Sequence, residues 1–123
     1  PGPATPMRLT AAQRLRRNSD FRAVREQGRR HDGGAFLLTW RAHPEAPQTR
    51  VGVVASRASV GGAVQRNRAK RRLREVFRKH QALVPAGLDL VLTARPATLR
   101  LEFNEIEQRF IQACQKLSAA KNV

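Results

Sequence analysis

The segment from Arg66 to Lys79 combines two properties that few folds accommodate together. Its fourteen residues, RNRAKRRLREVFRK, include eight lysines and arginines and one acid. Successive residues of a helix turn by about 100°, and on that basis the apolar residues fall on one side, at the i, i+4, i+7 and i+8 spacing of a helix that packs by one face. These residues are Ala69, Leu73, Val76 and Phe77. We therefore predict a helix that docks on a core by one stripe and is cationic elsewhere.

The opposite side of this helix is a row of mostly cationic side chains. The row consists of Asn67, Arg71, Arg74 and Arg78, with Arg68, Arg72 and Lys79 widening it and Arg66 and Lys70 bordering the apolar stripe. Like charges at i and i+4 repel and cost about 0.2–0.5 kcal/mol per pair. A bound polyanion would offset this repulsion.

The charge of the whole chain extends the argument beyond one segment. The 123 residues include 24 Lys+Arg against 9 Asp+Glu, a net charge of +15, with a pI near 11.9. A solvated basic face or a localisation signal explains a short run of charge, but an excess on this scale favours a nucleic-acid partner. We expect no membrane partner, because the sequence has no apolar run of 18 or more residues and no signal-peptide pattern.

Length and cysteine content indicate the domain organisation and the compartment. We expect a single nucleic-acid-binding domain over residues 8–123. Residues 1–7 are expected to be a disordered tail or a remnant of expression that precedes a native start at Met7. Cys114 is alone, so we expect no intrachain disulfide, no cysteine-based metal site and a reducing, cytoplasmic location. Its expected role is that of a small apolar residue in the last helix.

The N-terminal half predicts a helix followed by two strands. Residues 8–17 are expected to be extended or to form a loose turn, and Asn18 or Ser19 to cap a helix that ends at Gly28. Residues 35–42 and 49–56 alternate as strands do, and the loop between them suits an antiparallel hairpin. Trp40 alternates with Phe36 and Leu38, which assigns it to the core.

The C-terminal half predicts one more strand and one more helix. Residues 89–94 (DLVLTA) form a nearly continuous apolar run, typical of a central strand covered on both faces. The final helix has an apolar stripe made of Phe103, Ile106, Phe110, Ala113, Cys114 and Leu117. The order of elements therefore predicts a small α+β fold, a sheet with helices packed on it.

Catalytic signatures are missing from the sequence. The carboxylates are scattered, and His31, His43 and His80 are far apart, without the spacing of a zinc protease, a Ser/His/Asp triad or a phosphate-binding loop. A metal-dependent nuclease would need converging acids. We therefore assign no catalytic residues, and we identify no metal ligands on the protein.

The segment from Val60 to Arg74, VGGAVQRNRAKRRLR, resembles the signature of the bacterial ribonuclease P protein family. The hallmark of that signature is an Arg-Asn-Arg helix that continues into Lys-Arg. Residues 18–28 are similar to the first helix of the family, and residues 50–53 and 89–92 resemble the strands that flank the signature. The resemblance covers about residues 14–117.

This resemblance implies a fold and a function. The fold is a two-layer α+β sandwich of α-β-β-(β)-α-β-α order with a left-handed βαβ crossover, as in the second domain of the ribosomal protein S5 family. The function is removal of the 5′ leader from precursor tRNA by a ribonucleoprotein. Its RNA subunit hydrolyses the phosphodiester with Mg²⁺, held mainly by that RNA, while the protein binds the RNA subunit and the leader. Protein partners are not identified.

The resemblance also implies two sets of contact residues. The RNA-subunit contacts are Arg66, Asn67, Arg68, Lys70, Arg71 and Arg74. The leader-binding cleft includes Phe21, Arg17, Arg25, Leu37, Thr39 and Arg57, with Arg25 and Thr39 at positions where the family usually has aromatic rings.

Two other functions are compatible with the residues alone. A general structured-RNA-binding or ribosome-binding protein of similar architecture would have no effect on tRNA cleavage. A module that places the basic helix in a DNA major groove would prefer duplex DNA, although the segment lacks the heptads of a basic-zipper dimer.

Overall fold

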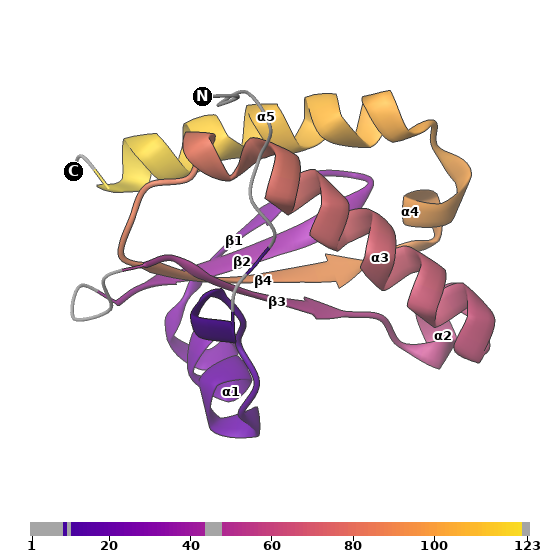
Figure 1. Cartoon of the computed structure of the whole chain (residues 1–123), viewed down its shortest axis with the longest axis horizontal. Coiled ribbons are helices and arrows are strands. Elements are labelled where there is room, and N and C mark those ends of the chain that lie inside the picture. The colour runs from indigo at the N-terminus through magenta and orange to yellow at the C-terminus, as the bar shows by residue number, and fades with distance from the viewer. Residues whose placement is uncertain (1–8, 10, 44–47, 122–123) are drawn as a thin grey trace.

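A four-stranded mixed sheet lies at the centre of the molecule (Figure 1). The computed structural model describes residues 9, 11–43 and 48–121. The elements in chain order are η1 (Ala11–Gln13), α1 (Asn18–Gln27), β1 (Arg29–Asp32), β2 (Phe36–Ala42), β3 (Arg50–Val54), α2 (Arg57–Val60), α3 (Ala63–His80), η2 (Gln81–Leu83), β4 (Leu88–Ala94), α4 (Pro96–Arg100) and α5 (Phe103–Lys121). The strand order is β1-β2-β4-β3. The tail expected over residues 1–7 lies outside the described residues.

Helices cover the sheet from both sides. Figure 1 shows α3 and α5 packed over one face and α1 against the other. The neighbouring strands β3 and β4 are parallel, and α3 connects them across the first face. In Figure 1 both strands run to the right, with β4 behind β3 and α3 above, which makes the crossover left-handed against the usual rule. The α+β sandwich and its left-handed crossover are thereby confirmed.

The predicted hairpin between the second and third strands is wrong. Strand β4 lies between β2 and β3, antiparallel to β2 and parallel to β3. The cause is the apolar run of β4, in which Leu88 to Leu92 are all buried. A strand that is apolar on both sides gains most from the central position, where helices cover both faces. The central position predicted for this strand is confirmed.

The first helix and the strand after it differ in detail from the prediction. The N-cap of α1 is Arg17, whose side chain makes no capping bond, so the predicted cap at Asn18 or Ser19 is wrong. The helix ends at Gly28 as predicted, and a Cβ there would stand 2.5 Å from the Trp40 carbonyl oxygen. Residues 29–32, RRHD, then form β1. This strand brings the number before α3 to three, which is the count that the family order gives when its strand in parentheses is present. Its charged, mostly exposed side chains gave no strand signal.

The main core lies between the sheet and the two long helices. The rings of Phe36 and Phe77 stand 6.1 Å and 6.3 Å from that of Phe110, and Trp40 is buried beside them as predicted. The predicted stripe of α5 is buried except for Phe103, which is partly buried against the core. Among the described helices none is long and apolar enough to cross a membrane.

Candidate nucleic-acid interface

Helix α3 begins where a glycine pair reverses the chain. Gly61 has a φ of 108°, a left-handed conformation that side chains disfavour, and Gly62 is the N-cap without a side-chain capping bond. From there α3 runs for 18 residues to His80. The predicted helix over residues 66–79 is therefore confirmed, with one more turn at its start.

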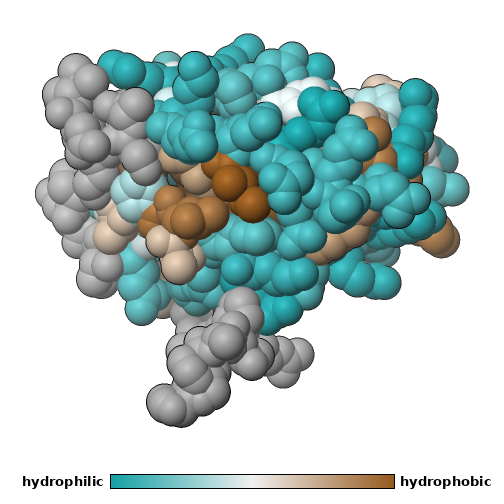
Figure 2. All heavy atoms as spheres, turned by 90° about the horizontal axis from the view of Figure 1, so that it is seen from above, coloured by the Kyte–Doolittle hydropathy of each residue, from teal (hydrophilic) through white to brown (hydrophobic). Residues whose placement is uncertain are grey.

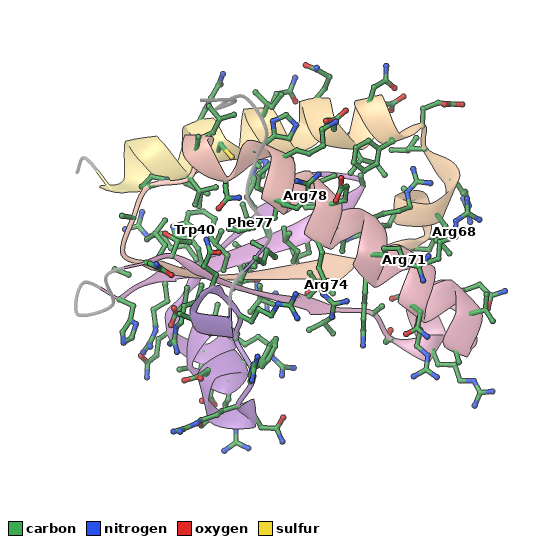
Figure 3. The ribbon with its side chains drawn as sticks, in the orientation of Figure 1. Trp40, Arg68, Arg71, Arg74, Phe77 and Arg78 are labelled. Atoms are coloured by element: carbon green, nitrogen blue, oxygen red, sulfur yellow. The ribbon has the colours of Figure 1, made fainter. Side chains whose placement is uncertain are left out.

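The apolar stripe of α3 faces the core. The four residues predicted for it, Ala69, Leu73, Val76 and Phe77, are all buried. The cations remain outside: Asn67, Arg68, Arg71 and Arg74 are exposed, while Arg66 and Lys70 are half-buried. Figure 3 shows Arg68, Arg71, Arg74 and Arg78 following one another along the helix. Seen from above, the face that α3 and α5 form is mostly hydrophilic (Figure 2).

Three other basic residues of α3 are engaged within the protein. Arg72 donates to the carbonyl oxygen of Leu101. Arg78 donates to both carboxylate oxygens of Glu75, at 2.9 Å and 2.6 Å, which raises the pKa of Arg78 and lowers that of Glu75. Lys79 lies 3.1 Å from a carboxylate oxygen of Glu107. These residues hold α3 in place, and Arg78, which the helical spacing put in the outward row, is partly neutralised.

The residues expected to contact the RNA subunit are not neutralised in this way. Within the described part of the chain, none of the six forms an ion pair. Burial lowers the pKa of Arg74, and the nearby charge of Arg14 lowers it further. The outcome is a strip of unpaired positive charge along a rigid helix, suited to phosphates in a regular array.

A cleft of about 390 Å³ opens between α1, β3 and α3. It is lined by Leu9, Arg14, Leu15, Arg16, Phe21, Val51, Gly52, Val53 and Arg74. The ring of Phe21 lies on Gly52, where any added Cβ would stand 2.5 Å from the ring atom Cζ. The glycine thus lets an aromatic ring approach the strand closely at the wall of the cleft.

Of the six residues expected to form a leader-binding cleft, Phe21 lines this one. Arg17, the N-cap of α1, and Arg25 of α1 are exposed, and Arg57 is exposed at the start of α2, but none of these three is among its lining residues. Leu37 is half-buried on β2. Thr39 is only 2% exposed, so it offers no contact surface in this conformation.

A buried carboxylate fixes the strand that forms the cleft wall. Asp89 is fully buried in β4 and accepts two hydrogen bonds from Arg50 of β3, at 2.9 Å and 2.8 Å. These bonds raise the pKa of Arg50. The same guanidinium lies 3.7 Å from a carboxylate oxygen of Asp20 in α1. Arg50 therefore joins the strand to the helix that carries Phe21, and the two walls of the cleft are held together.

Comparison with known proteins identifies the family to which this geometry belongs. A family model described as Ribonuclease P matches residues 9–118. The chain belongs to the ribonuclease P protein family. The ribonuclease P protein component of Acidothermus cellulolyticus is 37% identical over 116 residues, which is 93% of this chain and 95% of that protein. The component of Chloroflexus aurantiacus is 44% identical over 101 residues, covering 80% and 73%.

Solved structures of ribonuclease P proteins share the fold. The protein from Thermotoga maritima superimposes with a TM-score of 0.74 at 27% identity, covering 84% of this chain and 96% of that one. A Staphylococcus aureus mutant with defective mRNA degradation activity gives 0.74 at 26% identity, covering 88% and 89%. The resemblance found in the signature segment is thus confirmed over most of the chain.

The sequence patterns did not predict the cleft residues that lie outside α1 and α3. Arg14 and Leu15 lie in a segment predicted only as extended or turn-like, and the structure joins it to β3 through the Leu15 amide, which donates to the Val51 carbonyl at 2.9 Å. Two signals were available in the sequence. An apolar Leu15 stands within a basic stretch, and Gly52 interrupts an apolar strand, which often marks a close approach.

Proposed function

We propose that this chain is the protein subunit of ribonuclease P, which binds the catalytic RNA and the 5′ leader of precursor tRNA and so supports removal of the leader. Membership of the family supports the role in tRNA processing. The observation that carries the RNA-binding part is the outer surface of α3, whose six expected contact residues have no acidic partner in the described structure.

The RNA-subunit surface consists of Arg66, Asn67, Arg68, Lys70, Arg71 and Arg74. A guanidinium can grip a phosphate through two parallel hydrogen bonds, whereas a lysine acts as a point charge. Because the apolar stripe anchors α3, these side chains are presented with little loss of backbone freedom on binding. A rigid helix of this kind fits the fixed phosphate spacing of a folded RNA.

The leader surface lies around α1. Phe21 offers a ring for base stacking, which contributes about 1–3 kcal/mol per base, and Arg17, Arg25 and Arg57 offer phosphate contacts around it. Leu37 and Thr39 lie on the sheet beneath α1, and Thr39 would join the contact only if α1 moved. The wall of the Phe21 cleft includes Arg74 of α3, so the leader and the RNA subunit would be bound side by side.

The chemical step is assigned to the RNA subunit. Among the described residues no group of three or more His, Cys, Asp or Glu side chains could hold a metal ion, so we place no metal ligand on this chain and derive no catalytic step from it. In our proposal Mg²⁺ is held mainly by the RNA subunit and promotes phosphodiester hydrolysis there. We expect the complex to work in the cytoplasm.

Reconstitution tests this proposal. The chain is mixed with a cognate catalytic RNA and precursor tRNA at a Mg²⁺ concentration too low for the RNA alone, and release of the leader is measured. We expect the chain to restore cleavage at the mature 5′ end. A chain that binds the RNA tightly without restoring cleavage would instead have the alternative role of a general structured-RNA-binding protein.

A further inference from the structure

Two arginines that are far apart in the sequence line the Phe21 cleft and lie close enough to interact electrostatically. Arg14 and Arg74 both line this cleft of about 390 Å³ and also an adjoining one of about 270 Å³. Arg14 is held there by its backbone, because it pairs with Val51 on the edge of β3. Arg74 is held by α3.

The charges of this pair are not compensated within the described part of the protein. No described carboxylate forms an ion pair with Arg14 or Arg74, and the acid nearest to Arg74 in sequence, Glu75, is bound to Arg78. The proximity of Arg14 lowers the pKa of Arg74, in addition to the effect of burial. Two unpaired guanidinium groups that converge on one opening favour an anion between them.

Arg74 lies on a different flank of α3 from Arg68. The six positions from Arg68 to Arg74 correspond to about 120° around the helix. Burial lowers the pKa of Arg72, and the nearby charge of Arg68 lowers it further. Arg72 donates to Leu101 between α4 and α5, so Arg68 lies toward α4. Arg74 lies toward β3 and the N-terminal segment, as Figure 3 also shows. The cationic surface of α3 is therefore divided between two neighbouring regions.

We propose that Arg14 and Arg74 clamp one phosphate of a single-stranded RNA whose base stacks on Phe21. Arg74 then serves the single-strand site and not the RNA-subunit surface, and Arg14 is a binding residue outside the signature helix. The inference rests on the proposed function and deepens it. Its chemistry is that of two guanidinium groups on the two non-bridging oxygens of a phosphodiester, beside an aromatic platform that accepts any base.

The test measures two affinities with the assembled ribonucleoprotein. The first is the affinity of the chain for the catalytic RNA, and the second is the preference of the complex for precursor tRNA with a leader over tRNA without one. The variants are Arg14→Ala, Arg74→Ala, the double variant and Arg68→Ala. Arg29→Ala is the control, because it removes one exposed charge from β1, at the opposite edge of the sheet from β3.

Arg14→Ala and Arg74→Ala should each reduce the preference for the leader by about three- to tenfold, the loss of a partly exposed charged hydrogen bond. The slope of log affinity against log salt for leader-bearing tRNA should fall by about 0.7 in each. The double variant should reduce the leader preference only a little more than either single variant does, because both residues hold the same phosphate. Arg68→Ala should weaken assembly without changing the preference, and Arg29→Ala should change neither quantity.

Two results overturn the clamp. One is that Arg74→Ala weakens assembly as Arg68→Ala does and leaves the leader preference intact; the proposed function would then stand without the clamp. The other is full additivity of Arg14→Ala and Arg74→Ala, which would show two separate contacts. A wild-type chain that neither binds the catalytic RNA nor prefers the leader contradicts the proposed function itself. Arg14→Lys and Arg74→Lys keep the charge and serve if an alanine variant melts early by circular dichroism.

Discussion

Replacing Gly52 with alanine should disturb the leader site without touching the RNA-subunit surface. The new Cβ would stand 2.5 Å from Cζ of Phe21 and 3.1 Å from Cβ of Leu15. Ordinary contacts between carbon atoms are about 3.5–4.0 Å, so the ring has to move by about 1 Å or more. Phe21 is half-buried and borders an open cleft, so it can move outward.

The magnitude follows from two costs. Overpacking of this kind destabilises a protein by about 1–3 kcal/mol, and at this chain length each kcal/mol lowers the melting temperature by about 3–6 °C. The ring would leave its close contact with Gly52 of β3, and a base stacked on the ring contributes about 1–3 kcal/mol. We therefore expect Gly52→Ala to lower the preference for leader-bearing precursor over mature tRNA by about five- to a hundredfold.

The assay is a double-mutant cycle with Phe21→Ala, in which melting temperature, RNA-subunit affinity and leader preference are measured for all four proteins. Phe21→Ala alone should lower the leader preference and leave RNA-subunit affinity unchanged. Once the ring is removed, Gly52→Ala should cost little further stability or preference. Additive effects, or an equal loss of affinity for precursor and mature tRNA, would refute the reasoning and make Phe21 a purely structural residue.

Three further predictions concern other parts of the molecule. Asp89→Asn should lower the free energy of unfolding by about 2–4 kcal/mol in urea titrations, because Arg50 loses its buried charged partner but keeps some access to solvent; an unchanged midpoint would contradict this. Burial raises the pKa of Cys114 to about 12, so alkylation of the native protein at pH 8 should be far slower than in urea, and equal rates would show that the thiol is accessible. Arg71→Ala should weaken binding to the catalytic RNA and reduce its salt dependence by somewhat less than one unit of slope, whereas an unchanged slope in a filter-binding titration would remove Arg71 from the interface.

The sequence predicted the elements whose stabilising contacts are periodic. Helix α3 could be located because its buried residues repeat with the helical period and its mostly cationic row falls on the opposite side of the helix. Strand β4 could be placed at the centre because it is apolar on both faces. Periodicity could not predict the order of the strands. The order depends on which strand buries most apolar surface in the central position, and the strands that have to be compared are distant in sequence.

The candidate site likewise has residues that periodicity identified and residues that it did not. Helical geometry alone identified the outward cations of α3, apart from Arg72, Arg78 and Lys79, which are engaged within the protein. The cleft depends instead on the path of Arg14 and Leu15 along the edge of β3, and no local period encodes that path. Resemblance to the family assigned Phe21 to a leader-binding cleft, and in the structure Phe21 lines a cleft, but the resemblance did not indicate that Arg74 borders the same cleft.

The central claim is that the outward side of α3 binds the RNA subunit, and arginine-specific chemical modification read by mass spectrometry tests it most directly. With catalytic RNA alone, Arg68 and Arg71 should become protected while Arg29 stays reactive, and protection of Arg14 and Arg74 should increase only when leader-bearing precursor tRNA is added. Protection concentrated on other surfaces, with Arg68 and Arg71 as reactive in the complex as in the free chain, would contradict the account.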